Sequence, residues 1–138
     1  MKEYTISSIE LGMSESFCVT VSDEMLMGFR NISGDINPLH NDEEFAKTAG
    51  YKSRVVFGML CASLFSTLAG VYLPGKYCLL HELTTKFKKP VFVGDTLTVF
   101  GTVTEKSAAL RRITVSAKIV NQDGVLVNKA SIKAGILK

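Results

Sequence analysis

The chain has 138 residues, which is the length of one ordinary domain, and we expect a single domain over residues 1–138. Hydrophobic residues make up 46% and charged residues 21%, proportions typical of globular proteins, so the composition excludes a largely disordered chain. The net charge of +3 comes from scattered lysines and arginines without a basic stripe. Nucleic acid is therefore not expected as a partner.

The three cysteines, Cys18, Cys61 and Cys78, lie far apart and form no CxxC pair. This pattern fits a reducing compartment, and the first residues lack an apolar signal core, so we expect a cytoplasmic protein. Metal ligands are not clustered, and no metal site is predicted. The uncharged run over residues 55–73 is as long as a membrane span, but its glycines and hydroxyl residues lower its hydropathy. We therefore interpret it as a buried core helix rather than a membrane anchor.

Helix signals dominate the first half of the chain. Ser22 is a favourable N-cap, and Gly34 is a favourable helix terminator. Asn41 or Asp42 can cap a further helix. The predicted elements are a strand over residues 17–21, a helix over 23–32, a loop over 35–40, a short helix that Gly50 ends, and an apolar helix over 57–72.

From residue 76 the hydrophobic period changes to two, which predicts strands. Gln122-Asp123-Gly124 is a hairpin signal, and the parity of the last strand switches between Val127 and Ala130, which indicates a bulge. Strands segregated from helices predict an α+β protein with an antiparallel sheet wrapped around the apolar helix. Because such a sheet leaves open edges, we expect a homodimer.

The loop that contains Asp35 and His40 is the strongest candidate for chemistry. Pro38 fixes its own φ and pushes Asn37 out of the α region, so a stiff loop could aim both side chains into one space. The Asn37 amide could hold either side chain in place. His can exchange a proton near neutral pH. The alternative is purely structural, with Asp35 as a turn residue and His40 at the start of the next helix.

Two positions on the apolar helix are further candidates. Gly58 opens the helix, where backbone N–H groups are free and a ligand carbonyl could approach closely. A packing glycine is an equally good interpretation. Ser66 could contact a ligand, although most helix serines bond to a carbonyl one turn earlier, which is how we interpret Ser63. His81 has no ligand-like neighbour and is interpreted as structural.

With these residues, the chain resembles the MaoC-like hydratase/dehydratase family, which includes the (R)-specific enoyl-CoA hydratases. The resemblance extends over roughly residues 25 to 100. It rests mainly on the blocks Ser33-Gly34-Asp35-Ile36-Asn37-Pro38-Leu39-His40, Gly58-Met59-Leu60, Leu73-Pro74-Gly75 and Pro90-Val91-Phe92-Val93-Gly94-Asp95.

The resemblance implies a hot-dog fold, a dimer and a thioester of coenzyme A or acyl carrier protein as substrate, with no metal or redox cofactor. It assigns the catalytic pair to Asp35 and His40 and the carbonyl donor to the Gly58 N–H, with Ser66 near the pair. We group Gly58, Ser66 and Asn37 as substrate-binding residues. The implied reaction is the addition of water to a trans-2-enoyl thioester, or its reverse.

The chain departs from the family at Phe57, where many members carry His, and we expect this ring to change the wall of the substrate pocket. Two alternative functions remain. The first is an acyl-thioester hydrolase, which in this fold would typically use a carboxylate on the central helix, whereas residues 57–72 contain none. The second is a non-catalytic protein that binds an acyl thioester.

Overall fold

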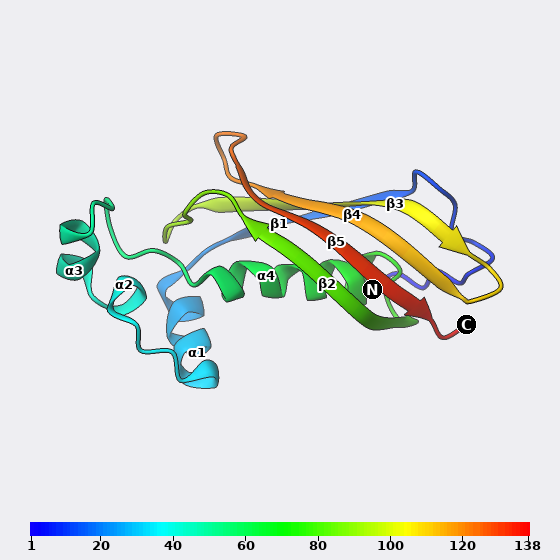
Figure 1. Ribbon diagram of the computed structural model, residues 1–138, viewed down its shortest axis with the longest axis horizontal. Coiled ribbons are helices and arrows are strands. Elements are labelled where there is room, and N and C mark those ends of the chain that lie inside the picture. The colour runs from blue at the N-terminus through cyan, green and yellow to red at the C-terminus, as the bar shows by residue number, and fades with distance from the viewer.

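The computed structural model describes residues 1–138, which form a five-stranded antiparallel sheet packed on one central helix (Figure 1). In space the strands follow the order β1-β3-β4-β5-β2, so β1 and β2 are the sheet edges. This arrangement confirms the predicted α+β class and the sheet that wraps around the apolar helix. The strands are β1 (Ser14–Thr20), β2 (Cys78–Phe87), β3 (Thr96–Ser107), β4 (Arg112–Val120) and β5 (Leu126–Ile136).

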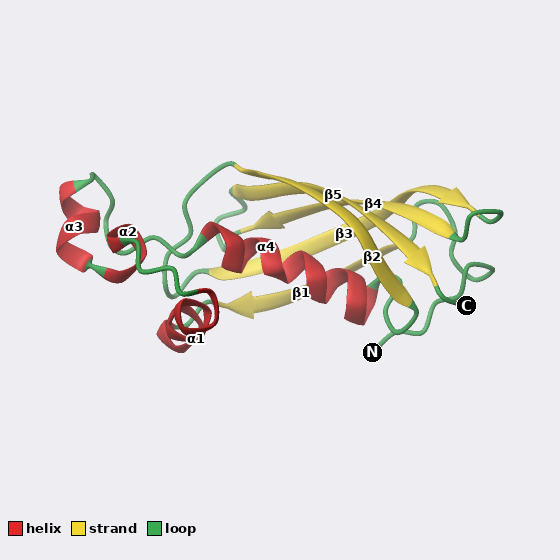
Figure 2. Ribbon diagram, turned by 60° about the horizontal axis from the view of Figure 1, so that its bottom comes forward, coloured by secondary structure: helices red, strands yellow, loops and turns green.

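All helices precede residue 73. Figure 2 shows α4 lying along one face of the sheet, while α1, α2 and α3 extend beyond its end. The predicted apolar helix is present, but its last turns have π rather than α geometry. The helices are α1 (Asp23–Ser33), α2 (Pro38–Asn41), α3 (Glu43–Thr48), α4 (Gly58–Thr67) and the π-helical continuation η1 (Leu68–Tyr72).

Local capping explains where the first helices begin and end. The Ser22 hydroxyl accepts a hydrogen bond from the backbone N–H of Met25, and Gly34 adopts a left-handed conformation with φ of 73°, as the sequence predicts. Of the two candidate caps for α3, Asp42 fills the role by accepting from the N–H of Phe45.

The prediction of a loop over residues 35–40 is wrong for its second half, because α2 begins at Pro38 and includes His40. Asn37 caps this short helix by accepting from the Leu39 N–H. Asn and Pro favour turns, but the same two residues also suit the cap and first position of a helix.

The core lies between the sheet and the central helix. The alternating residues of β3 and β4 that the sequence predicts to share one face, such as Val99 and Val115, are fully buried. Gly101 of β3 allows η1 to approach closely, because a Cβ there would lie 2.7 Å from Leu68 Cδ2.

β5 has a bulge where it pairs with β4, as the parity switch in the sequence predicts. Ile119 pairs with Asn128, whereas the next residue, Val120, pairs with Leu126. Val127 is therefore the extra residue, and both Val127 and Asn128 are buried. No helix of the protein is long and apolar enough to span a bilayer.

Candidate active site

Val55 fixes the position of α2. Its backbone N–H donates to the Leu39 carbonyl at 3.1 Å, and its own carbonyl lies 2.7 Å from His40 Nδ1. The next residue, Val56, donates to the Val91 carbonyl at 2.8 Å. The segment that leads into α4 thus connects the short helix of His40 to the turn before β3. His40 is held by backbone groups rather than by extensive packing.

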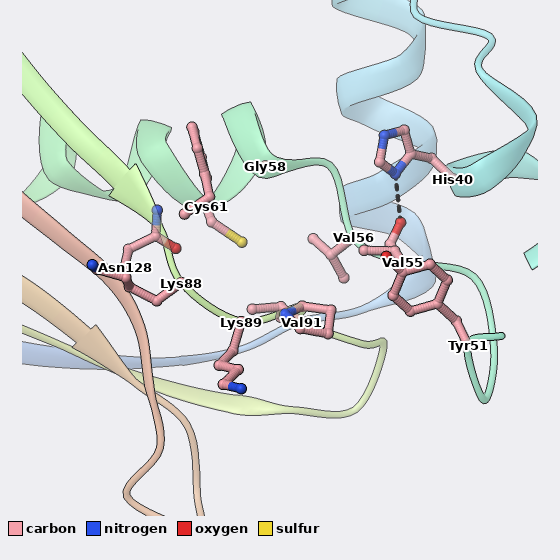
Figure 3. A pocket seen from close by; sticks show the side chains of 12 residues that line it. His40, Tyr51, Val55, Val56, Gly58, Cys61, Lys88, Lys89, Val91 and Asn128 are labelled. Carbon is pink, nitrogen blue, oxygen red and sulfur yellow. Dashed lines mark hydrogen bonds between the residues drawn. The ribbon is translucent and has the colours of Figure 1, made fainter. Parts of the chain in front are cut away.

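The contact with Val55 determines which nitrogen of the neutral His40 ring carries the hydrogen. A carbonyl oxygen can only accept, so Nδ1 carries the hydrogen, and in the neutral ring Nε2 has a free lone pair. In Figure 3 the second ring nitrogen points away from Val55. The imidazole therefore presents a basic nitrogen that nothing in the chain occupies.

Phe57 supports the other side of this ring. It is 1% exposed, and its ring centroid lies 4.4 Å from that of His40 and 5.0 Å from that of Phe29. Phe57 does not line the adjacent cavity. The expectation that this ring alters the pocket wall is therefore wrong, because the ring packs against His40 and is buried away from the cavity.

A cavity of about 280 Å³ opens beside His40 and the start of α4 (Figure 3). The amides of Leu60 and Cys61 donate to the Phe57 carbonyl, whereas no hydrogen bond uses the amide of Gly58. Phe57 also provides no side-chain cap. The cavity is lined by His40, Tyr51, Val55, Val56, Gly58, Cys61, Phe87, Lys88, Lys89, Pro90, Val91 and Asn128.

The structure does not bring all the predicted residues together. Asp35 and Asn37 are exposed and lie outside the cavity lining, and no hydrogen bond joins Asp35 to His40. The Asp35 carboxylate instead accepts from the Asn37 N–H at 3.0 Å through one oxygen, which leaves the other oxygen free. The Asn37 amide caps α2 through its oxygen, and its nitrogen holds neither Asp35 nor His40. In a single chain, then, only His40 of the expected pair reaches the cavity.

The helix serines differ from each other. The Ser63 hydroxyl donates to the Leu60 carbonyl at 2.6 Å, as expected of a structural serine. Ser66 is exposed, has no hydrogen-bond partner in the chain and does not line the cavity. His81 lies on edge strand β2, where its ring packs over Gly135. No group of three or more His, Cys, Asp or Glu side chains could hold a metal ion.

Several cavity residues were not predicted from the sequence. In the sequence, Lys88 and Lys89 are recognisable only as two adjacent positive charges, which does not indicate a cavity. Asn128 carries a detectable signal, because it shares the inward parity of Ala130 and Ile132. Cys61 faces the cavity, but burial raises the pKa of its thiol to about 12, so it stays protonated and inert at neutral pH.

A family model described as the MaoC like domain matches residues 8–124. The chain belongs to the MaoC-like dehydratase family. It is 38% identical to an (R)-specific enoyl-CoA hydratase of Rhodospirillum rubrum over 118 residues, covering 81% of this chain and 82% of that protein. It is also 38% identical to an (R)-specific enoyl-CoA hydratase of Aeromonas caviae over 119 residues, covering 86% of this chain and 89% of that one.

Solved structures agree with this placement. The (R)-hydratase from A. caviae superposes with a TM-score of 0.89 at 35% identity, covering 94% of this chain and 98% of that chain. The R-hydratase of Pseudomonas aeruginosa gives a TM-score of 0.90 at 30% identity, covering 96% and 84%. These neighbours confirm the hot-dog fold.

Proposed function

We propose that the protein is a hydratase/dehydratase, which adds water to a trans-2-enoyl thioester to give an (R)-3-hydroxyacyl thioester, or catalyses the reverse. One observation carries the proposal: a histidine with a free Nε2 and an unused helix N-terminal amide lie on the same cavity. The first suits proton transfer, and the second suits a carbonyl oxygen that becomes negative. The relatives named as (R)-specific enoyl-CoA hydratases support this assignment.

The proposed mechanism uses Asp35, His40 and Gly58. Asp35 and His40 hold a water molecule, and one of them takes a proton from it. The water oxygen bonds to the β-carbon, and the electron pair of the C2–C3 double bond moves toward the thioester carbonyl. The Gly58 N–H stabilises the resulting enolate oxygen. The pair then delivers one proton to the α-carbon as the enolate electrons form the new C–H bond. This replaces the proton taken from water and returns the pair to its starting state, so no redox cofactor or metal is required.

We further propose that the protein acts as a homodimer, because the catalytic loop is too open in one chain. Ile36, between Asp35 and Asn37, is 71% exposed, and Met59 at the start of α4 is 62% exposed. A second copy that covers these side chains would also shield the catalytic loop from bulk water and leave only the water molecule that reacts. Light scattering should give a mass near twice 15.1 kDa. A monomer that turns over normally would contradict this proposal.

Two attributes accompany this function. We propose acyl groups carried by coenzyme A or acyl carrier protein as the substrate class, since both present the same thioester arm. We also propose a cytoplasmic location, which the three free cysteines support.

The decisive experiment incubates the purified protein with crotonyl-CoA and follows the enoyl absorbance. Loss of absorbance without thiol release is expected for the hydratase. Release of free coenzyme A would identify a thioesterase instead. Tight binding of crotonyl-CoA without turnover would identify a non-catalytic binding protein. Either of these two outcomes overturns the proposal.

A further inference from the structure

Asn128 is an unusual residue in this core. It is 2% exposed, and besides Asp95 it is the only buried side chain that is polar or charged. It lies on the inward face of β5 with Ala130 and Ile132, next to the bulge at Val127, and pairs with Ile119 of β4 and Phe87 of β2. It lines the same cavity as His40 and Gly58 (Figure 3). A buried amide at this position needs a physical reason, because burying polar groups is costly unless they are hydrogen-bonded.

Thr85 determines which way the Asn128 amide points. The Thr85 hydroxyl donates its only hydrogen to the Lys129 carbonyl at 3.2 Å. Toward Asn128 it can therefore only accept, and it accepts from Nδ2 at 3.4 Å. The Asn128 oxygen consequently points the other way and has no partner in the chain. It is not sealed off either, because the protein has no fully inaccessible polar side-chain atom without a hydrogen bond.

Asp95 shows what a purely structural buried polar residue looks like in this protein. One of its oxygens accepts from the Phe92 N–H and the other from the Gln122 amide, both at 2.9 Å. Asp95 thus satisfies both oxygens within the chain. Asn128 leaves its oxygen open toward a cavity instead, which is the arrangement expected of a group that receives a ligand.

We infer that Asn128 is a specificity-determining residue, whose amide oxygen accepts a hydrogen bond from an O–H or N–H donor on the bound thioester. The inference rests on the proposed function and adds the chemical feature that the cavity recognises. Two parts of such a ligand carry this donor: an amide N–H of the pantetheine arm, or a hydroxyl on the acyl chain. A carboxylate or carbonyl group at this point would be rejected, because two acceptors would face each other.

The test measures binding rather than turnover. Dissociation constants for butyryl-CoA and 4-hydroxybutyryl-CoA, neither of which can undergo the proposed reaction, are compared by calorimetry in the wild type and Asn128→Leu. We expect about tenfold weaker binding where the hydrogen bond is lost. Weakening of both ligands assigns the donor to the pantetheine arm, and weakening of 4-hydroxybutyryl-CoA alone assigns it to the acyl hydroxyl. Asn31→Leu, an exposed asparagine on α1, is the matched control.

Stability separates this role from a structural one. Asn128→Leu removes an oxygen without a partner and one long hydrogen bond of 3.4 Å to the half-buried Thr85, so its Tm should stay close to that of the wild type. Should Asn128→Leu not fold, Asn128→Val, a smaller side chain suited to a strand, serves in the same assays. Unchanged affinity for both ligands in a folded variant, or no binding of either by the wild type, overturns the inference. Asn128-dependent binding in a protein that does not hydrate crotonyl-CoA would leave this inference standing and sink the proposed function alone.

Discussion

The sheet with its central helix and the segment of residues 22–54 are built by different means. Most of the 23 side chains of the hydrophobic core come from the sheet and α4–η1. Leu26 and Ala46 are the only buried residues in the segment that carries α1, α2 and α3, and of these two only Leu26 belongs to that core. Figure 1 shows these three helices beyond the end of the sheet. Apart from Leu26 and the rings of Phe29 and His40 that pack on Phe57, they are held by polar contacts. Examples are the Arg54–Asp23 ion pair and the hydrogen bonds of Val55.

This difference separates stability from chemistry. The residues proposed for catalysis, Asp35 and His40, lie in the lightly packed segment, and the buried area that stabilises the fold lies elsewhere. Changes to the proposed pair should therefore alter activity with little effect on folding. Changes under the central helix should do the reverse.

The largest effect is expected at the proposed catalytic pair. Asp35→Asn or His40→Gln should lower the turnover of crotonyl-CoA by about 10²–10⁴-fold, because each removes a group that exchanges a proton in the reaction. Both side chains lie outside the core, so the Tm should change little. Steady-state kinetics and thermal unfolding of the same preparations test both expectations.

The chain offers a matched control for each variant. His81→Gln changes the other histidine, which is exposed on β2, and Asp123→Asn changes an exposed aspartate in the β4–β5 turn. Both controls should keep wild-type kinetics. Near-normal hydration by Asp35→Asn or His40→Gln would refute the assignment of that residue.

The next largest effect concerns two glycines, one from each region. In Gly101→Ala the new Cβ would lie 2.7 Å from Leu68 Cδ2 and 3.0 Å from Val115 Cγ1, and both side chains are fully buried. Such overpacking should lower the free energy of unfolding by about 1–3 kcal/mol. Gly28→Ala, on α1 with no atom near the new Cβ, should raise it by about 0.5–1 kcal/mol. Urea titrations measure both free energies of unfolding. If both variants were destabilised, or both stabilised, the proposed difference in packing between the two regions would be wrong.

A smaller effect is expected where the two regions meet, at Gly58. A Cβ there would lie 3.1 Å from Phe87 Cε1, a ring that is 54% exposed and can move. Gly58→Ala should therefore leave stability unchanged, while the methyl group at the cavity should lower kcat/KM about tenfold, or by about 1.4 kcal/mol. If stability falls together with activity, Gly58 is a packing glycine, which is the other interpretation of the sequence.

The sequence predicts the two regions unequally. Period-two alternation and the hairpin signal give β3, β4 and β5 with their buried faces, because each strand has one face in the core. Capping residues place α1 and α3 nearly to the residue. The start of α2 is missed because Asn37-Pro38 serves a turn and a helix N-terminus equally well.

The site is predicted only in part, for a physical reason. His40 and Gly58 are signalled by local residue types, but the carbonyl of Val55 that orients His40 comes from a residue without any side-chain signal. Asn128 reaches the same cavity from β5, near the far end of the chain. Contacts of this kind depend on tertiary structure. For the same reason the sequence could not show that Asp35 stays outside the cavity of one chain.

The smallest predicted effect is a polar contact within the sheet region itself. Glu15 of β1 accepts from Tyr4 Oη at 2.7 Å and pairs with Lys2 at 3.0 Å, and these contacts, the Tyr4 hydrogen bond foremost, lower the pKa of the Glu15 carboxyl. A lowered pKa in the folded state means that this contribution is complete above the unfolded pKa and disappears as the pH falls through the folded value. Glu15→Gln should therefore cost less than about 1 kcal/mol at pH 7, because Lys2 is half exposed, and nothing at low pH.

Urea unfolding of the wild type and Glu15→Gln at neutral and acidic pH measures this loss, with the exposed Glu10→Gln as control. A difference that persists in acid would mean that Glu15 acts through packing instead of charge. Disappearance of the difference in acid would show that Glu15 acts through its charge, and the size of the difference at neutral pH would show how little this polar contact contributes. Contacts of the same weak kind hold α2 and α3, so that segment can be remodelled at little cost to the fold.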